Sequence, residues 1–165
     1  MTATGLQAHV DALAELCRHS STTVAVAESL TCGAIVSAIG AGKNAGNWLR
    51  GGVVAYSVDV KRSVLGVTAE QLVSEECARE LAMGVRRLLG ADAAVSSTGV
   101  GGPGSEEGQP PGTVHLAAAW DGGAITESTW FSGTPEEVLE QTVIAALALL
   151  EKAIRMRADG PSAGM

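Results

Sequence analysis

Residues that could carry chemistry gather at three places in the sequence, and each place directly follows a short apolar run. The first is the segment "ESLTCG" (28–33), the second is "YSVDVK" (56–61) and the third is "STGVGGPG" (97–104). Together they offer a carboxylate, several hydroxyl groups, a thiol, a phenol, a lysine and backbone amides next to glycine. Such a set suits nucleophilic attack on a carbonyl group, or the binding of a small anion.

The segment 28–33 lies where a strand-like pattern changes into a helix-like one. Ser29 could cap the helix, as serine commonly does, or it could be a nucleophile. Thr31 can also cap, which would leave one of the two hydroxyls free to face a substrate. A carboxylate at the end of a buried strand, such as that of Glu28, needs a partner unless it lies in solvent. The free N–H groups from Thr31 to Gly33 would favour a negative group nearby.

The second segment offers two groups that could activate a hydroxyl. Lys61 could serve as a base if burial removed its proton, although a lysine on a short helix is usually solvated. Tyr56 could do the same, or pack as an edge aromatic. Cys32 could gain thiolate character at a helix N-terminus, or be an ordinary small buried residue. The pattern alone leaves these alternatives open.

Composition excludes several classes of protein. The net charge of −7 and an aromatic content of 3% oppose nucleic-acid binding. Three cysteines without a CxxC spacing and scattered histidines predict neither a disulfide framework, a metal site nor a Ser-His-Asp triad. The sequence contains no apolar run of about 18 residues and no leader-like start, so we expect a cytoplasmic protein without membrane contact.

The elements that must position these groups alternate along the chain. Apolar spacing predicts helices over 5–19, 34–39, 58–66, 74–88 and from 134 onward, and strands over 22–28, 51–57, 91–98, 113–120 and 124–131. Alternation followed by a hairpin predicts an α/β fold, a three-layer α/β/α sandwich with a mixed, mainly parallel sheet. We expect one domain over 1–157 and a flexible tail over 158–165. Ligands of such sheets gather at the carboxyl ends of the strands, where the three segments lie.

Taken together, the motifs resemble the CinA C-terminal domain family, also called the competence/damage-inducible or PncC-type nicotinamide mononucleotide deamidase family. "AESLTCG" is similar to the family's AESCTGG, "GGVVAYSVDVKRSVLGV" to GGVVTYSNEAKxxLLGV, and "STGVGGPG" to TGIAGPGG. "LVSEECARELAMGVRRLLGAD" and "PPGTVHLAAA" match further motifs in the same order. The resemblance covers nearly the whole chain.

The resemblance implies an amidohydrolase that needs no metal or cofactor. It would convert nicotinamide mononucleotide and water to nicotinate mononucleotide and ammonia. Ser29 would be the nucleophile, and Lys61, with Tyr56 nearby, would accept its proton or hold it in line. Besides this small-molecule nucleotide, we expect a partner copy of the chain, because the family usually forms homo-oligomers (dimers or larger). The expected substrate-binding residues are Glu28, Thr31, Gly33, Thr98, Gly99 and Gly101.

The chain departs from the family pattern at positions that bear on activity. Cys32 replaces a glycine, so its side chain could intrude on a substrate that passes close to the backbone. The segment "FSGTPEEVLEQ", where the family has an aspartate and arginines, instead holds Thr134, Pro135 and Leu139. A phosphate would lose its bidentate partners there, unless Arg50 or Lys43 stands in. The alternative to an enzyme is a paralogue that binds a nucleotide-like ligand or a protein partner without turnover.

Overall fold

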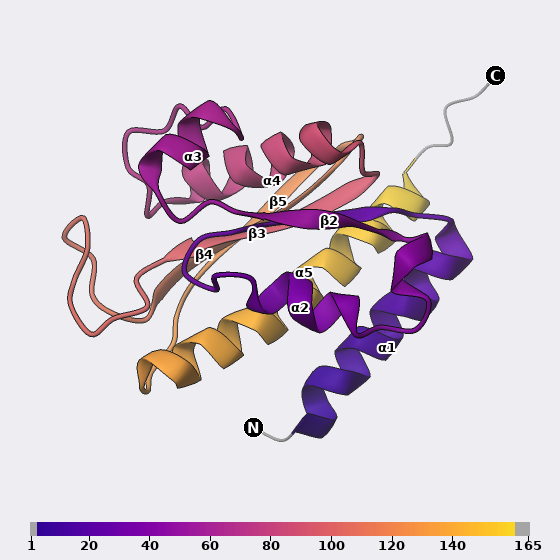
Figure 1. The fold of residues 1–165 in the computed structure, drawn as a ribbon, viewed down its shortest axis with the longest axis horizontal. Helices are drawn as coiled ribbons and strands as arrows, with labels where there is room; N and C mark the ends of the chain where they lie inside the picture. Colours follow the sequence, from indigo (N-terminus) through magenta and orange to yellow (C-terminus); the bar gives the residue numbers. More distant parts are fainter. Residues whose placement is uncertain (1–2, 161–165) are drawn as a thin grey trace.

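A five-stranded mixed sheet lies between two layers of helices in the computed structural model, which describes residues 3–160 (Figure 1). The strands are β1 (Val24–Glu28), β2 (Leu49–Val54), β3 (Ala93–Gly99), β4 (Thr113–Trp120) and β5 (Gly123–Trp130). The helices are α1 (Ala3–Ser20), α2 (Ala34–Gly40), the 3₁₀ helix η1 (Ala45–Asn47), α3 (Val58–Ser63), α4 (Glu75–Leu89) and α5 (Pro135–Asp159). The predicted α/β/α sandwich is confirmed.

The strand order is β2-β1-β3-β4-β5. β1 pairs in parallel with β2 and with β3, whereas β3–β4 and β4–β5 pair antiparallel. The sheet is therefore mixed, as predicted, but it is not mainly parallel. The hairpin that "DGG" predicts joins β4 to β5, and it supplies one of the antiparallel pairings while the return from β3 to β4 supplies the other.

The helix ends follow from local side-chain capping. The Ser74 hydroxyl accepts a hydrogen bond from the Cys77 N–H at the start of α4. Thr134 and Glu137 form the predicted capping box of α5, with Pro135 in the first helical position. This helix continues to Asp159, past the expected domain end at 157, while residues 161–165 lie outside the described residues.

The two helix layers cover opposite faces of the sheet. The core on one side joins α1, α2 and α5 to the sheet, and the core on the other side joins α4 and the segment after α3. The crossover from β1 to β2 therefore runs over one face and the crossover from β2 to β3 over the other. The carboxyl ends of β1 and β3 consequently form a topological switch point, the place where open α/β sheets bind ligands.

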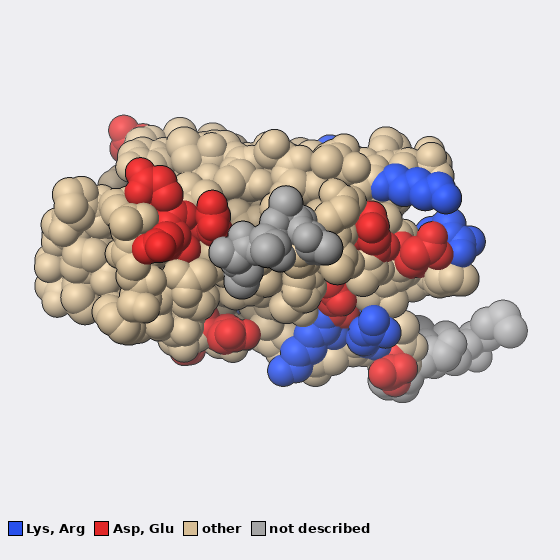
Figure 2. Space-filling view, turned by 90° about the horizontal axis from the view of Figure 1, so that it is seen from below, with Lys and Arg blue, Asp and Glu red and all other residues tan. Residues whose placement is uncertain are grey.

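Surface charge is distributed unevenly over the face that carries α1 and α5. Figure 2 shows acidic side chains toward the left end of this face, where α5 begins in Figure 1. The lysine and arginine side chains in this view lie from the middle of the face to its opposite end. Within residues 3–160, no helix is both long enough and apolar enough to cross a membrane.

Candidate functional site

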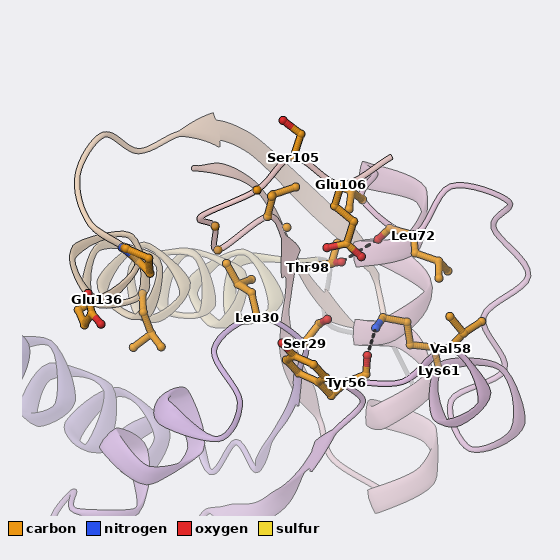
Figure 3. Close-up of a pocket in the computed structure, with 18 residues that line it drawn as sticks. Ser29, Leu30, Tyr56, Val58, Lys61, Leu72, Thr98, Ser105, Glu106 and Glu136 are labelled. Atoms are coloured by element: carbon orange, nitrogen blue, oxygen red, sulfur yellow. Dashed lines mark hydrogen bonds between the residues drawn. The ribbon is translucent and has the colours of Figure 1, made fainter. Parts of the chain in front are cut away.

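A cavity of about 560 Å³ opens at the switch point, between the carboxyl ends of β1, β2 and β3 and the start of α5 (Figure 3). It joins the three segments that the sequence marks as chemical, because parallel neighbouring strands end at the same edge of the sheet. Six of the predicted site residues line it: Ser29, Tyr56, Lys61, Thr98, Gly99 and Gly101. Their expected proximity is thus observed, although Ser29 and Lys61 are far apart in the sequence.

Ser29 is held at the end of β1 by its backbone. Its N–H donates a hydrogen bond of 3.1 Å to the carbonyl oxygen of Ser97, which ties the junction to β3. The residue is only 9% exposed, and it lines the cavity. Among the described residues, neither its hydroxyl nor the N–H of Leu30 has a hydrogen-bond partner. Both groups are therefore free to meet a ligand.

Lys61 is buried, with 4% of its surface exposed, and its amine reaches the cavity from α3. Nζ donates hydrogen bonds of 2.7 Å to the Ala55 carbonyl and 3.1 Å to the Tyr56 carbonyl. Burial lowers the pKa of this amine, while the Glu106 and Glu107 carboxylates oppose the shift. Cys77 opposes it only as a thiolate, and burial raises the pKa of that thiol to about 11.

The two carbonyl partners account for two positions on the Lys61 nitrogen and leave a third without a partner among the described residues. A neutral amine has two N–H donors and one lone pair, so both donors are satisfied and the lone pair remains. An ammonium group would have a third N–H without a partner among the described residues. No hydrogen bond joins the amine to the Ser29 hydroxyl within residues 3–160, although both side chains reach into the same cavity (Figure 3).

Tyr56 contacts Lys61 through its backbone and not through its phenol. Its side chain is 70% exposed at the mouth of the cavity, and its hydroxyl makes no hydrogen bond with the described residues. The ring is thus placed to cover a ligand. The Lys61 amine reaches the Tyr56 carbonyl, so no contact links the phenol to the proton of Ser29.

Three of the predicted substrate-binding residues do not line the cavity: Glu28, Thr31 and Gly33. The buried Glu28 carboxylate instead accepts hydrogen bonds from the N–H groups of Gly33, Ile35 and Val36, at 3.0, 3.0 and 2.8 Å. It thereby occupies the N-terminus of α2, which the sequence analysis had offered to a substrate. Thr31 bonds to Ser97 at 2.7 Å, so neither Ser29 nor Thr31 caps this helix.

The glycine-rich loop after β3 forms one wall of the cavity. Thr98 donates its hydroxyl proton to the Leu72 carbonyl at 2.7 Å, so this hydroxyl is already engaged. A Cβ at Gly99 would collide with the Thr113 carbonyl oxygen, because β3 and β4 approach closely there. The Gly101 N–H donates no hydrogen bond within the described part of the chain, so it can serve a ligand.

Acidic residues of this loop and of α5 were not predicted as site residues. Glu106 and Glu136 line the cavity, and Figure 3 shows Glu136 at the end away from Lys61. Glu107 anchors the loop by accepting hydrogen bonds from the N–H groups of Leu72 and Val73, at 3.0 and 2.8 Å. The sequence signal for them was the pair of consecutive acids, Glu106 and Glu107, inside a glycine- and proline-rich loop.

Two of the residues that depart from the family pattern line the cavity, and Cys32 does not. Cys32 is exposed and does not line the cavity, so its side chain does not intrude on it. Pro135 and Leu139 do line it, whereas neither Lys43 nor Arg50 does. Among the described residues, Lys61 is thus the only lysine or arginine of the lining. No cluster of three or more metal-binding side chains was found in residues 3–160.

Comparisons with known proteins match most of the chain. The family model of the CinA C-terminal domain matches residues 6–154. The chain is 42% identical over 130 residues to a competence-damage inducible protein of Bacillus velezensis, covering 76% of this chain and 31% of that protein. It is 38% identical over 150 residues to a CinA-like protein of Frankia casuarinae, covering 88% and 34%. The chain therefore spans about a third of the length of these curated relatives.

Solved structures are similar over nearly their whole length. A CinA superfamily protein of Klebsiella pneumoniae superposes with a TM-score of 0.86 at 34% identity, covering 91% of this chain and 98% of that one. A CinA superfamily protein of Escherichia coli gives a TM-score of 0.86 at 32% identity, covering 91% of each chain. The fold around the cavity is accordingly one that has been observed experimentally.

Proposed function

The chain belongs to the CinA C-terminal domain family, and on that premise we propose that it is a metal-independent amidohydrolase acting on a carboxamide in the cavity at the switch point. The resemblance implies nicotinamide mononucleotide as the substrate to test first. The observation that carries the proposal is the environment of Lys61. In its neutral form this buried amine would have both N–H donors bonded to carbonyls and its lone pair free in the cavity that Ser29 lines.

In the proposed first step, the Ser29 oxygen attacks the carboxamide carbon while Lys61 accepts the serine proton. An unassisted hydroxyl is a weak nucleophile, so this proton transfer is required. The hydrogen bond between the two side chains would form in the substrate complex, since catalytic contacts often tighten only there. Lys61, then protonated, would return the proton to the leaving nitrogen, and ammonia would depart.

The negative oxygen of the tetrahedral intermediate needs hydrogen-bond donors. The N–H of Leu30 directly follows the nucleophile, and Gly101 lines the cavity from the loop after β3. The N–H groups of both residues are without partners among the described residues, so they are our candidates for an oxyanion site. Loss of one such donor typically costs about 3 kcal/mol of transition-state stabilisation.

The second half of the reaction would regenerate Ser29. Water would attack the acyl-serine ester while the neutral Lys61 amine accepts a proton from it. Lys61 would then give this proton to the Ser29 oxygen as the ester bond breaks, and the carboxylic acid product would leave. The exposed Tyr56 ring lies at the cavity mouth, where it would limit access of bulk water to the ester. No step in this scheme uses the Tyr56 hydroxyl.

The test is ammonia release from purified protein supplied with nicotinamide mononucleotide. We expect turnover by the wild type, loss of turnover in Ser29→Ala, and normal turnover in Ser132→Ala, whose hydroxyl is exposed and outside the cavity. A thermal shift with the nucleotide but no ammonia would contradict the proposal and favour the alternative, a ligand-binding paralogue without turnover. Homo-oligomer formation stays a prediction, which the molar mass in solution would test.

A further inference from the structure

The cavity offers little positive charge to a phosphate, and this bears on the substrate of the proposed reaction. Lys61 is the only lysine or arginine among its described lining residues, whereas Glu106 and Glu136 contribute two carboxylates. Lys61 is itself engaged with two carbonyl oxygens, and it must be neutral to act as a base. Phosphate sites in proteins normally rely on arginine, lysine or free N–H groups at a helix N-terminus.

Two of the helix starts beside the cavity, those of α2 and α5, are capped by side chains of this chain. The Glu28 side chain takes three N–H groups at the start of α2. At the start of α5, the first helical residue is Pro135, which has no N–H, and Thr134 accepts the N–H of Glu137. The first turn of α5 also carries the charges of Glu136 and Glu137. A phosphate at the start of α2 would have to displace Glu28, and one at the start of α5 would meet the charges of Glu136 and Glu137.

The charges around the cavity favour the opposite kind of ligand. At the end of the molecule where α5 begins, the visible charged side chains are acidic, whereas acidic and basic side chains are mixed farther along that face (Figure 2). Apolar side chains of Leu30, Pro135 and Leu139 complete the lining on the α5 side. A flat, positively charged ring with an uncharged polar substituent would meet apolar contacts and two carboxylates there. A dianion would meet repulsion.

We propose that the site selects a carboxamide without a phosphate, in the chemical class of a pyridinium nucleoside. This inference rests on the proposed function, and it names the substrate class of the same site. Glu136 would accept hydrogen bonds from sugar hydroxyls, and Glu106, which lies on the Lys61 side of the cavity, would offset the charge of the ring (Figure 3). The carboxamide would lie toward Ser29 and Lys61, at the end of the cavity away from Glu136 (Figure 3).

The test compares two probes that differ only in the phosphate, nicotinamide riboside and nicotinamide mononucleotide. Their dissociation constants are measured by calorimetry on the Ser29→Ala protein, where neither compound can be turned over. We expect the riboside to bind at least as tightly as the mononucleotide. Tighter binding of the mononucleotide by about tenfold or more, or no binding of either compound, would overturn the inference.

Substitutions in α5 test whether its charged and apolar side chains cause the selection against phosphate. In Glu136→Gln, we expect binding of the mononucleotide to improve by about two- to fivefold relative to the riboside, the usual range for one exposed charge. Glu140→Gln removes the same charge from an exposed position on the same helix that does not line the cavity, and it should leave the ratio unchanged. Leu139→Arg should shift preference toward the mononucleotide. An unchanged ratio in both Glu136→Gln and Leu139→Arg would contradict the proposal.

The outcomes separate this inference from the function on which it rests. Ammonia release by the wild type tests the amidohydrolase, and the ratio of the two dissociation constants tests the selection against phosphate. Turnover with a strong preference for the mononucleotide would sustain the function and refute the inference. Tighter riboside binding without ammonia release from either probe would do the reverse.

Discussion

Replacement of Glu28 by glutamine separates two roles for a carboxylate that lies directly before the proposed nucleophile. Glu28 is 1% exposed, and its two oxygens accept three backbone hydrogen bonds from the first turn of α2. If the role of Glu28 is to hold these N–H groups, the substitution lowers the free energy of unfolding. If Glu28 instead contacts a substrate, the substitution raises KM and leaves the free energy of unfolding nearly unchanged.

The expected magnitude follows from the bonds that glutamine can keep. One carboxylate oxygen accepts the N–H groups of Gly33 and Ile35, and the other accepts that of Val36. The amide oxygen of glutamine can replace only one of these acceptors, so the Val36 N–H loses its partner and the other two bonds lose their charge assistance. An unsatisfied buried donor costs roughly 1–3 kcal/mol, and weakening two bonds adds about 1 kcal/mol. We therefore expect a loss of about 2–4 kcal/mol.

The assay is urea unfolding of Glu28→Gln followed by circular dichroism. Glu70→Gln is the matched control, because Glu70 is exposed and makes no side-chain hydrogen bond with the described residues. The control should stay within about 0.5 kcal/mol of the wild type. An unfolding free energy of Glu28→Gln that equals the control value would refute the structural role of Glu28.

Two further predictions concern the base and the packing behind it. In the proposed mechanism the neutral amine of Lys61 is the base, and burial lowers its pKa, so kcat/KM should rise with pH and level off below the ordinary pKa of lysine. The Glu106 carboxylate opposes that shift, so Glu106→Gln should move the midpoint of the pH profile to lower pH. The control Glu140→Gln should leave this midpoint in place. An unmoved midpoint in Glu106→Gln would count against Lys61 as the titrating group. In Gly84→Ala, the new Cβ meets the Leu65 carbonyl oxygen behind α3, which should lower the free energy of unfolding by about 2–4 kcal/mol. Gly46→Ala, where a Cβ meets nothing within 4 Å, is the control for that measurement, and equal stability of the two variants would show that the approach of α4 to Leu65 is not tight.

Much of the fold follows from local sequence signals. The buried run of β1, the caps at Ser74 and Thr134 and the turn between β4 and β5 each specify an element without reference to the rest of the chain. The share of parallel and antiparallel pairings in the sheet was harder to predict, because the direction in which β4 pairs with β3 depends on the long loop between them. The sequence marked the start of α5 but not its end, since helix ends carry weak signals.

The cavity could be predicted in outline but not in its charges. Strand order brings Ser29, Lys61 and Thr98 to one edge, and the pattern of short strands already implied this. The partners of individual polar groups depend on side-chain directions that spacing does not give. Glu28 therefore turned out to cap α2, and Glu106 turned out to face the cavity.

The central claim is that Ser29 and Lys61 act as one catalytic unit, and a double-mutant cycle on kcat/KM tests it most directly. Ammonia release is measured for Ser29→Ala, Lys61→Met and the double variant, each verified as folded by its unfolding transition. Residues of one unit are strongly non-additive, so each single variant should lose about 10³-fold or more, and the double variant should lose no more than the worse single one. Losses that multiply in the double variant, or a Lys61→Met protein that retains wild-type turnover, would contradict the account.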